Sequence, residues 1–163
     1  MTRAHPWSCL ACLISALAFL PAVEAATIEL GSNTVTRGVE IDVPLVADVG
    51  DTPLGRYKVF ITYDTNLVQF VRFTNVDTNF GPVEVNTIIP GEIGACANNI
   101  GSMTAPTGVV QVAKITFQVV GRPGATARLS FRDAGLFRTT DAELVQTVAR
   151  EGKITISASG GPP

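Results

Sequence analysis

The stretch Arg56–Phe73, RYKVFITYDTNLVQFVRF, decides the fold because it contains two strands and the turn between them. Side chains of alternating character along Arg56–Tyr63 indicate a strand with one buried face. The residues expected to face the core are Tyr57, Val59, Ile61 and Tyr63. The residues expected on the opposite, exposed face are Arg56, Lys58, Phe60 and Thr62. Asp64-Thr65-Asn66 supplies turn chemistry, and Leu67–Phe73 resumes as an apolar run. The pattern predicts a sheet with one face buried in the core and one solvent-exposed face that is free to bind a ligand or partner.

Similar runs recur along the chain, separated by segments rich in Gly, Pro, Asn and Ser. The predicted strands are Thr27–Leu30, Val39–Val46, Arg56–Tyr63, Leu67–Phe73, Val83–Ile89, Gly91–Ala97, Val109–Val120, Thr126–Arg132 and Lys153–Ser157. The best helix candidate is Asp141–Arg150, whose Thr147-Val148 pair is equally compatible with an extended chain. Short, regular strands without a sustained helical period predict an all-β antiparallel sandwich.

The two ends of the chain are expected to lie outside this fold. Residues 1–25 have a basic start, an apolar core at Cys9–Leu20 and small residues up to Ala25, which are typical of a secretory signal peptide. A permanent membrane anchor is the rival interpretation, but the apolar run is shorter than the roughly 20 residues that span a bilayer. We therefore predict a sandwich domain at 26–157 and a flexible tail or linker remnant at 158–163. The localisation that follows is secreted, extracellular or at the cell surface.

Removal of the signal peptide would take away the only histidine and two of the three cysteines, leaving Cys96. The mature protein would then have no histidine for acid–base catalysis and no second cysteine for an internal disulfide. Cys96, in a Gly/Ala/Asn stretch, is interpreted as a small core-like residue. The sequence contains no nucleophile motif and no phosphate-binding glycine loop. We expect no catalytic residues, no cofactor and no metal; the nearest calcium-like fragment, Asp77–Gly81, lacks the remaining ligands.

The charge pattern also limits the partners. The chain has a formal net charge of −2 and no basic stripe, which argues against nucleic acid. No amphipathic basic helix is evident, so membrane insertion after signal cleavage is not expected.

Four motifs in order give the chain a resemblance to cohesins, the modules that receive dockerins in cellulosomes. These are Thr34–Gly38 with Val43-Pro44-Leu45, Tyr63–Val68 with Phe70, Gly108 with Val112–Val119, and Gly152–Ile156. The resemblance covers about Ala26 to Ile156. It implies a nine-stranded jelly-roll-like antiparallel β-sandwich in which one sheet face docks a protein. It further implies that the strand with the Tyr-Asp motif belongs to that face, with Arg56, Lys58, Phe60 and Thr62 as partner-binding residues.

At one point the chain departs from the cohesin pattern. Cellulosomal type I cohesins tend to carry Asn-x-Asp where this sequence has Arg56-x-Lys58. Two cations in place of acceptors would select an acidic or carbonyl-rich partner. The alternative is that both are ordinary solvated charges that discourage sheet stacking.

Three functions fit these features to different degrees. The first is a secreted, non-catalytic docking module for a dockerin-like or other extracellular protein, in polysaccharide breakdown or surface assembly. The second is a carbohydrate-binding module of the related β-sandwich fold; it would need exposed coplanar aromatics, and only Phe60 and Phe80 are candidates. The third, an enzyme with paired carboxylates, ranks last because its acidic residues are scattered in loops.

Overall fold

The computed structural model describes residues 25–158, and within them every regular element is a strand. The twelve strands are β1 (Ala26–Leu30), β2 (Ser32–Thr36), β3 (Glu40–Asp48), β4 (Leu54–Tyr63), β5 (Val68–Asn75), β6 (Glu84–Asn86), β7 (Glu92–Asn98), β8 (Val109–Val119), β9 (Thr126–Arg138), β10 (Leu144–Val145), β11 (Thr147–Arg150) and β12 (Gly152–Ser157). The all-β prediction is confirmed. The predicted signal peptide, apart from Ala25, and residues 159–163 of the predicted tail lie outside the described residues.

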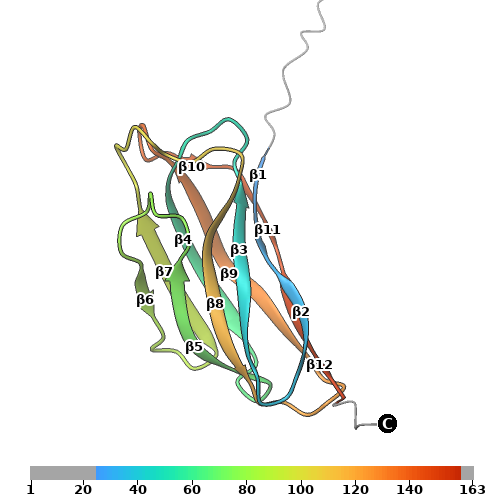
Figure 1. Ribbon diagram of the computed structural model, residues 1–163. Helices are drawn as coiled ribbons and strands as arrows, with labels where there is room; N and C mark the ends of the chain where they lie inside the picture. Colours follow the sequence, from blue (N-terminus) through green and yellow to red (C-terminus); the bar gives the residue numbers. More distant parts are fainter. Residues whose placement is uncertain (1–24, 159–163) are drawn as a thin grey trace, which may run out of the picture.

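The strands form two sheets packed face to face. Sheet A has the order β11-β1-β3-β8-β5, and sheet B has the order β2-β12-β9-β4-β7-β6, with β10 paired to β9. Figure 1 shows β3 and β8 of sheet A passing in front of β9 and β4 of sheet B. The sandwich is therefore confirmed, but nine strands was too low a count. The purely antiparallel prediction was also wrong, because β1–β11 and β2–β12 pair in parallel.

Both parallel pairs arise because two segments of chain cross from one sheet to the other. β1 lies in sheet A and continues after Gly31 as β2 in sheet B; β11 and β12 make the same crossing at Gly152. A Cβ on Gly152 would lie 2.4 Å from the carbonyl oxygen of Gly31, and one on Gly31 would lie 2.5 Å from Cδ of Pro44. Glycine is needed because the backbones approach more closely than any side chain permits. Pro44 lies where β1 leaves β3, and its carbonyl accepts a hydrogen bond from the Gly31 amide at 2.9 Å.

The core between the sheets includes the inward residues predicted for β4, because Tyr57, Val59 and Ile61 are fully buried. Alternate residues of β8 and β12 are fully buried beside them, namely Ile115, Phe117, Val119, Ile154 and Ile156. Tyr63 is half-buried and packs edge-on against Phe117, with ring centroids 5.3 Å apart. Burial raises the pKa of both the Tyr57 and Tyr63 hydroxyls. Because Tyr57, Val59 and Ile61 point into the core, the side chains that alternate with them along β4 must lie on the outer face of sheet B.

Three local predictions need correction. The helix candidate Asp141–Arg150 forms β10 and β11, because pairing with β9 and β1 outweighs a weak helical propensity. The predicted strand Val83–Ile89 ends at Asn86, whose Oδ1 accepts a hydrogen bond from the Ile88 amide at 3.0 Å and turns the chain. The strand beginning at Thr126 runs on to Arg138, with a register shift opposite Phe60/Ile61 in β4.

Candidate functional site: the outer face of sheet B

The four predicted site residues all lie on the outer face of sheet B, which is the solvent side of β9, β4, β7 and β6. Arg56, Lys58, Phe60 and Thr62 are each half-buried, while their β4 neighbours Tyr57, Val59 and Ile61 are fully buried. β4 is flanked by β7 on one side and β9 on the other. The predicted residues therefore run along the interior of a sheet, where the pairing of both neighbours fixes their positions.

Phe60 is held in place by the residues around its ring. Lys58 Nζ lies 5.0 Å and Arg132 Cζ 4.6 Å from the ring centroid. On the β7 side, Phe60 is opposite Gly94, and a Cβ at Gly94 would lie 2.9 Å from Cε1 of Phe60. Arg132 Nη2 also lies 3.1 Å from Oε1 of Glu92, a side chain that is only 12% exposed. Phe60 is thus a fixed aromatic surface between two cations, one of which is already neutralised.

A second aromatic–cation pair lies further along β4. Arg56 Cζ is 5.5 Å from the ring centroid of Phe137, which β9 places directly opposite Arg56. Leu144 of β10 pairs with Phe137 and is 61% exposed. Arg56 makes no ion pair within residues 25–158, and its Nε is covered without a hydrogen-bond partner there. The charge of Arg56 is therefore not neutralised by the fold.

Three hollows open on this face. One of about 330 Å³ lies over β4, β7 and β6, and it is lined by Lys58, Phe60, Glu84, Val85, Asn86, Gly94, Ala95 and Cys96. A second, of about 250 Å³, is lined by Phe60, Asn86, Ile88, Ile89, Glu92, Gly94 and Arg132. The third, of about 400 Å³, is lined by Thr62, Tyr63, Asp64, Leu67, Thr126, Arg128 and Ser130. Phe60 borders the first two hollows, while Thr62 borders the third and donates a hydrogen bond to the carbonyl of Ser130 at 3.3 Å.

Several residues of this face were missed by the sequence analysis. Arg132 lies on this face by the ordinary alternation of β9, and the β-bulge at Arg132 turns Phe137 outward as well, opposite Arg56. Ile88 and Ile89 were assigned to a strand, but they are 84% and 54% exposed beside the second hollow. The bulge leaves no mark in the sequence, whereas the Asn86-Thr87 sequence before two isoleucines was a usable turn signal.

Cys96 and Phe80 are placed differently from the prediction. Cys96 is half-buried on the outer face opposite Lys58, not in the core, with Sγ 3.6 Å from Oε2 of Glu84. Phe80 is 6% exposed and packs edge-on against Tyr57, with centroids 5.3 Å apart. Phe80 therefore contributes to the core and offers no surface to a sugar.

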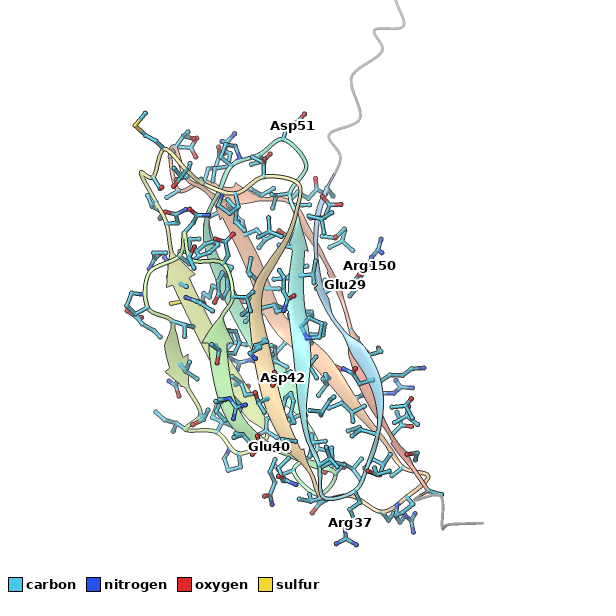
Figure 2. The ribbon with its side chains drawn as sticks, in the orientation of Figure 1. Glu29, Arg37, Glu40, Asp42, Asp51 and Arg150 are labelled. Atoms are coloured by element: carbon cyan, nitrogen blue, oxygen red, sulfur yellow. The ribbon has the colours of Figure 1, made fainter. Side chains whose placement is uncertain are left out.

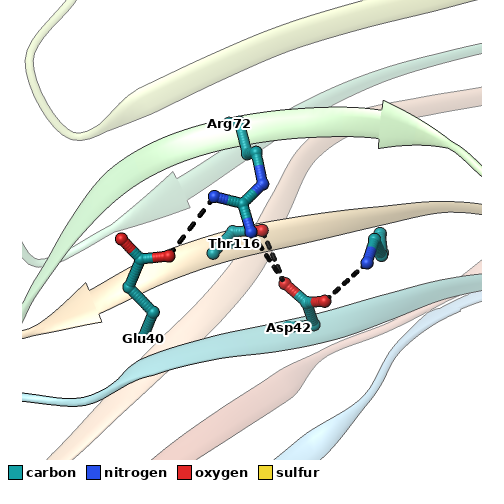
Figure 3. A network of polar contacts seen from close by, with 5 residues as sticks. Glu40, Asp42, Arg72 and Thr116 are labelled. Atoms are coloured by element: carbon teal, nitrogen blue, oxygen red, sulfur yellow. Dashed lines mark hydrogen bonds and ion pairs between the residues drawn. The ribbon is translucent and has the colours of Figure 1, made fainter.

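The outer face of sheet A has a different character, because the fold itself neutralises its cations. Asp42 accepts hydrogen bonds from Lys114 Nζ at 2.7 Å and from Thr116 Oγ1 at 2.6 Å, and Arg72 Nη1 contacts Glu40 Oε2 at 3.3 Å (Figure 3). Hydrogen bonds from Lys114 and Thr116 lower the pKa of Asp42.

At the other side of sheet A, Arg150 lies 3.9 Å from Glu29; Figure 2 shows the two residues at neighbouring positions on β11 and β1. Each cation that β5, β8 or β11 presents on this face therefore has a carboxylate neighbour.

Within residues 25–158, no cluster of three or more His, Cys, Asp or Glu side chains has the geometry of a metal site. In the calcium-like fragment, Oδ1 of Asp77 accepts hydrogen bonds from the amide and side chain of Asn79, both at 2.8 Å. These bonds close a local turn. Nor does this part of the chain hold a helix of the length and apolarity that crossing a membrane requires.

Comparison with solved structures identifies the fold. The chain superimposes on a type I cohesin in the OlpA–Doc918 cohesin–dockerin complex of Clostridium thermocellum with a TM-score of 0.72 and 18% identity, covering 81% of this chain and 99% of that chain. The seventh ScaB type I cohesin of Pseudobacteroides cellulosolvens gives 0.71 and 17%, covering 85% and 96%. A non-cellulosomal cohesin of the archaeon Archaeoglobus fulgidus gives 0.69 and 16%, covering 83% and 94%.

No family model and no curated protein matches the sequence. At this level of identity the superpositions define the fold, which is that of a cohesin-like domain over nearly the whole of the described chain. The predicted resemblance is thereby confirmed in structure.

Proposed function

We propose that this protein is a secreted, non-catalytic docking module, and that the outer face of sheet B binds a dockerin-like or other extracellular protein. The observation that carries the proposal is the contrast between the two faces. Sheet A neutralises its own charges, whereas sheet B presents a fixed aromatic between open hollows and leaves Arg56 and Lys58 without carboxylate partners among the described residues. A rigid face with a central aromatic is suited to protein recognition.

The cohesin-like fold supports the same conclusion. Solved structures with this fold include cohesins in complex with dockerins. In the proposed interface Phe60 is the central anchor, Arg56 and Lys58 select the partner, and Thr62 lies at the margin. The module would act in polysaccharide breakdown or in surface assembly, with residues 1–25 as the export signal and 158–163 as a linker.

The test begins with export of the full chain and purification of its mature form, whose N-terminus should be Ala26. The immobilised protein is then used to capture partners from the culture supernatant of the producing organism, and the captured protein is purified for calorimetry. Phe60→Ala should weaken its binding by about 2 kcal/mol or more, as truncation of a central anchor does. The matched control is Val71→Ala, a 40% exposed apolar residue on β5 of the other sheet, which should leave the affinity unchanged. Equal affinities of wild type and Phe60→Ala would show that the outer face of sheet B is not the docking surface.

A further inference from the structure

The charge distribution over the two sheets carries an inference about the partner. The chain as a whole has a formal net charge of −2. On the outer face of sheet B, however, cations outnumber carboxylates. The cations are Arg56, Lys58, Arg128, Arg132 and Lys153, and the carboxylates are Glu84, Glu92 and Asp133. Only Arg132 is in an ion pair there, with Glu92.

We propose that the protein partner presents an acidic segment with an aliphatic anchor, its carboxylates meeting Arg56 and Lys58 and its aliphatic side chain entering the hollow between Phe60 and Ile88-Ile89. This inference rests on the proposed function and specifies its ligand. Both cations already lie over aromatic rings, Arg56 over Phe137 and Lys58 over Phe60. The charged groups of Arg56 and Lys58 are therefore already held at the face, which reduces the conformational entropy that these side chains lose when a partner binds.

The spacing of the two cations indicates which segment fits. Arg56 and Lys58 are two residues apart on one face of β4, which separates their Cα atoms by about 7 Å. Carboxylates at positions i and i+4 of a helix project from Cβ atoms about 6 Å apart. An acidic helix can therefore present one carboxylate to each cation.

The hollow beside Phe60 favours a protein over an acidic polysaccharide. Its walls include the exposed side chains of Ile88 and Ile89 as well as the Phe60 ring, and its volume is about 250 Å³. An aliphatic side chain buries apolar area against such walls, whereas a uronate chain, apart from its carboxylates, can place only C–H faces and hydroxyls against them. Arg132, paired with Glu92, lines this hollow without adding an unpaired charge.

The experiment uses two fluorescent helical peptides as probes. The acidic peptide carries Glu at i and i+4 beside Leu residues, and the basic peptide has Lys at the same positions. Fluorescence anisotropy with the mature protein should show binding of the acidic peptide at least about tenfold tighter than that of the basic one. Raising the salt from about 20 mM to about 200 mM should weaken the binding, because exposed charges are then screened.

Charge reversal provides the decisive variant. The double change Arg56→Glu and Lys58→Glu should invert the preference, so that the basic peptide binds more tightly. The matched control, Arg37→Glu with Arg122→Glu, alters net charge equally at two exposed loop positions, and Figure 2 shows Arg37 at one end of the sandwich. The control should leave the preference for the acidic peptide intact. If the reversed protein melts early, Arg56→Gln with Lys58→Gln removes the charges and should abolish the preference.

The outcomes separate this inference from the proposed function. Loss of binding in Phe60→Ala with no effect of the charge variants would retain the face and overturn the acidic partner. Equal binding of both peptides, or equal effects of the test and control pairs, would also overturn it. Binding of polygalacturonate without binding of the acidic peptide would identify a polysaccharide ligand instead, and would contradict both proposals.

Discussion

The ring of Phe60 lies directly beside the backbone of Gly94, so closely that a Cβ on Gly94 would approach Cε1 of Phe60 to 2.9 Å. The two residues are cross-strand neighbours on β4 and β7. The absence of a side chain at Gly94 therefore sets both the position of the Phe60 ring and the shape of the two hollows that it borders.

Gly94→Ala should displace the Phe60 ring and weaken partner binding by about 1 kcal/mol or more, through loss of a preorganised anchor. The melting temperature should change little, since the ring can move outward into solvent. Calorimetry with the native partner measures the first effect and thermal denaturation the second. In a Phe60→Ala background the same substitution should cost almost nothing, because the two changes act through one contact. Additive losses in the double variant would contradict this account.

Ile115→Asp should destabilise the fold by about 3 kcal/mol or more, because it places a carboxylate without a partner between the sheets. Ile115 is fully buried in β8. Urea denaturation followed by far-UV circular dichroism measures the free energy of unfolding. Gln111→Asp, at an exposed position of the same strand, is the control and should remain within about 0.5 kcal/mol of wild type. A wild-type midpoint for Ile115→Asp would refute the assignment of this face of β8 to the core.

Gly152→Ala should cost about 1–3 kcal/mol, since the added methyl group would meet the Gly31 carbonyl at 2.4 Å and force the two crossing segments apart. An ordinary Gly→Ala change in a strand would be expected to stabilise it, which makes the sign of the effect informative. Thr34→Ala, exposed on β2 next to the crossing, controls for a general sensitivity of this edge. Stabilisation by Gly152→Ala would mean that the sheets do not require this close approach.

Asp42→Asn tests the charge network of sheet A by its pH dependence. Because Lys114 and Thr116 lower the pKa of Asp42 below its ordinary value of 3.8, the folded state binds this proton less readily than the unfolded state. The stabilisation by Asp42 is thus present above that value and is lost as the pH falls through and below it. The variant should be less stable than wild type by about 0.5–1 kcal/mol at neutral pH and should approach it near pH ~3. Asp51→Asn, an exposed carboxylate far from this network (Figure 2), should show no such convergence, and a pH-independent loss in Asp42→Asn would argue against the ion pairs.

The carbohydrate alternative predicts retention on insoluble polysaccharides, whereas the structure leads us to expect none on cellulose, chitin or xylan. Within residues 25–158, Phe80 and Tyr57 are buried, and the two rings on the outer face of sheet B lie against cations, Phe60 against Lys58 and Arg132 and Phe137 against Arg56, which is unlike the bare aromatic platform of a sugar-binding surface. Affinity electrophoresis in gels containing each polysaccharide measures this directly. Retardation that Phe60→Ala abolishes would make sugar binding the leading function.

The sequence by itself determined the strands of the sandwich interior and the face to which each β4 side chain belongs. Alternation with a period of two is a local property, and it placed Tyr57, Val59 and Ile61 inside and Arg56, Lys58 and Phe60 outside without knowledge of any neighbour. Turn residues likewise marked most strand ends. The weak helical pattern at Asp141–Arg150 gave a wrong prediction, because this segment pairs as β10 with β9 and as β11 with β1.

Only the tertiary structure decided what surrounds those outward side chains. Gly94 and Arg132 meet Phe60 because β7 and β9 flank β4, and a bulge in β9 turns Phe137 outward opposite Arg56. The same is true of charge: Asp42 and Lys114 neutralise each other across β3 and β8, while Arg56 has no carboxylate opposite it in the described chain. Such pairings join residues tens of positions apart, so they depend on which strands become neighbours rather than on any local pattern. The sandwich could therefore be predicted from the chain, whereas the contrast between its two faces required the pairing of the strands.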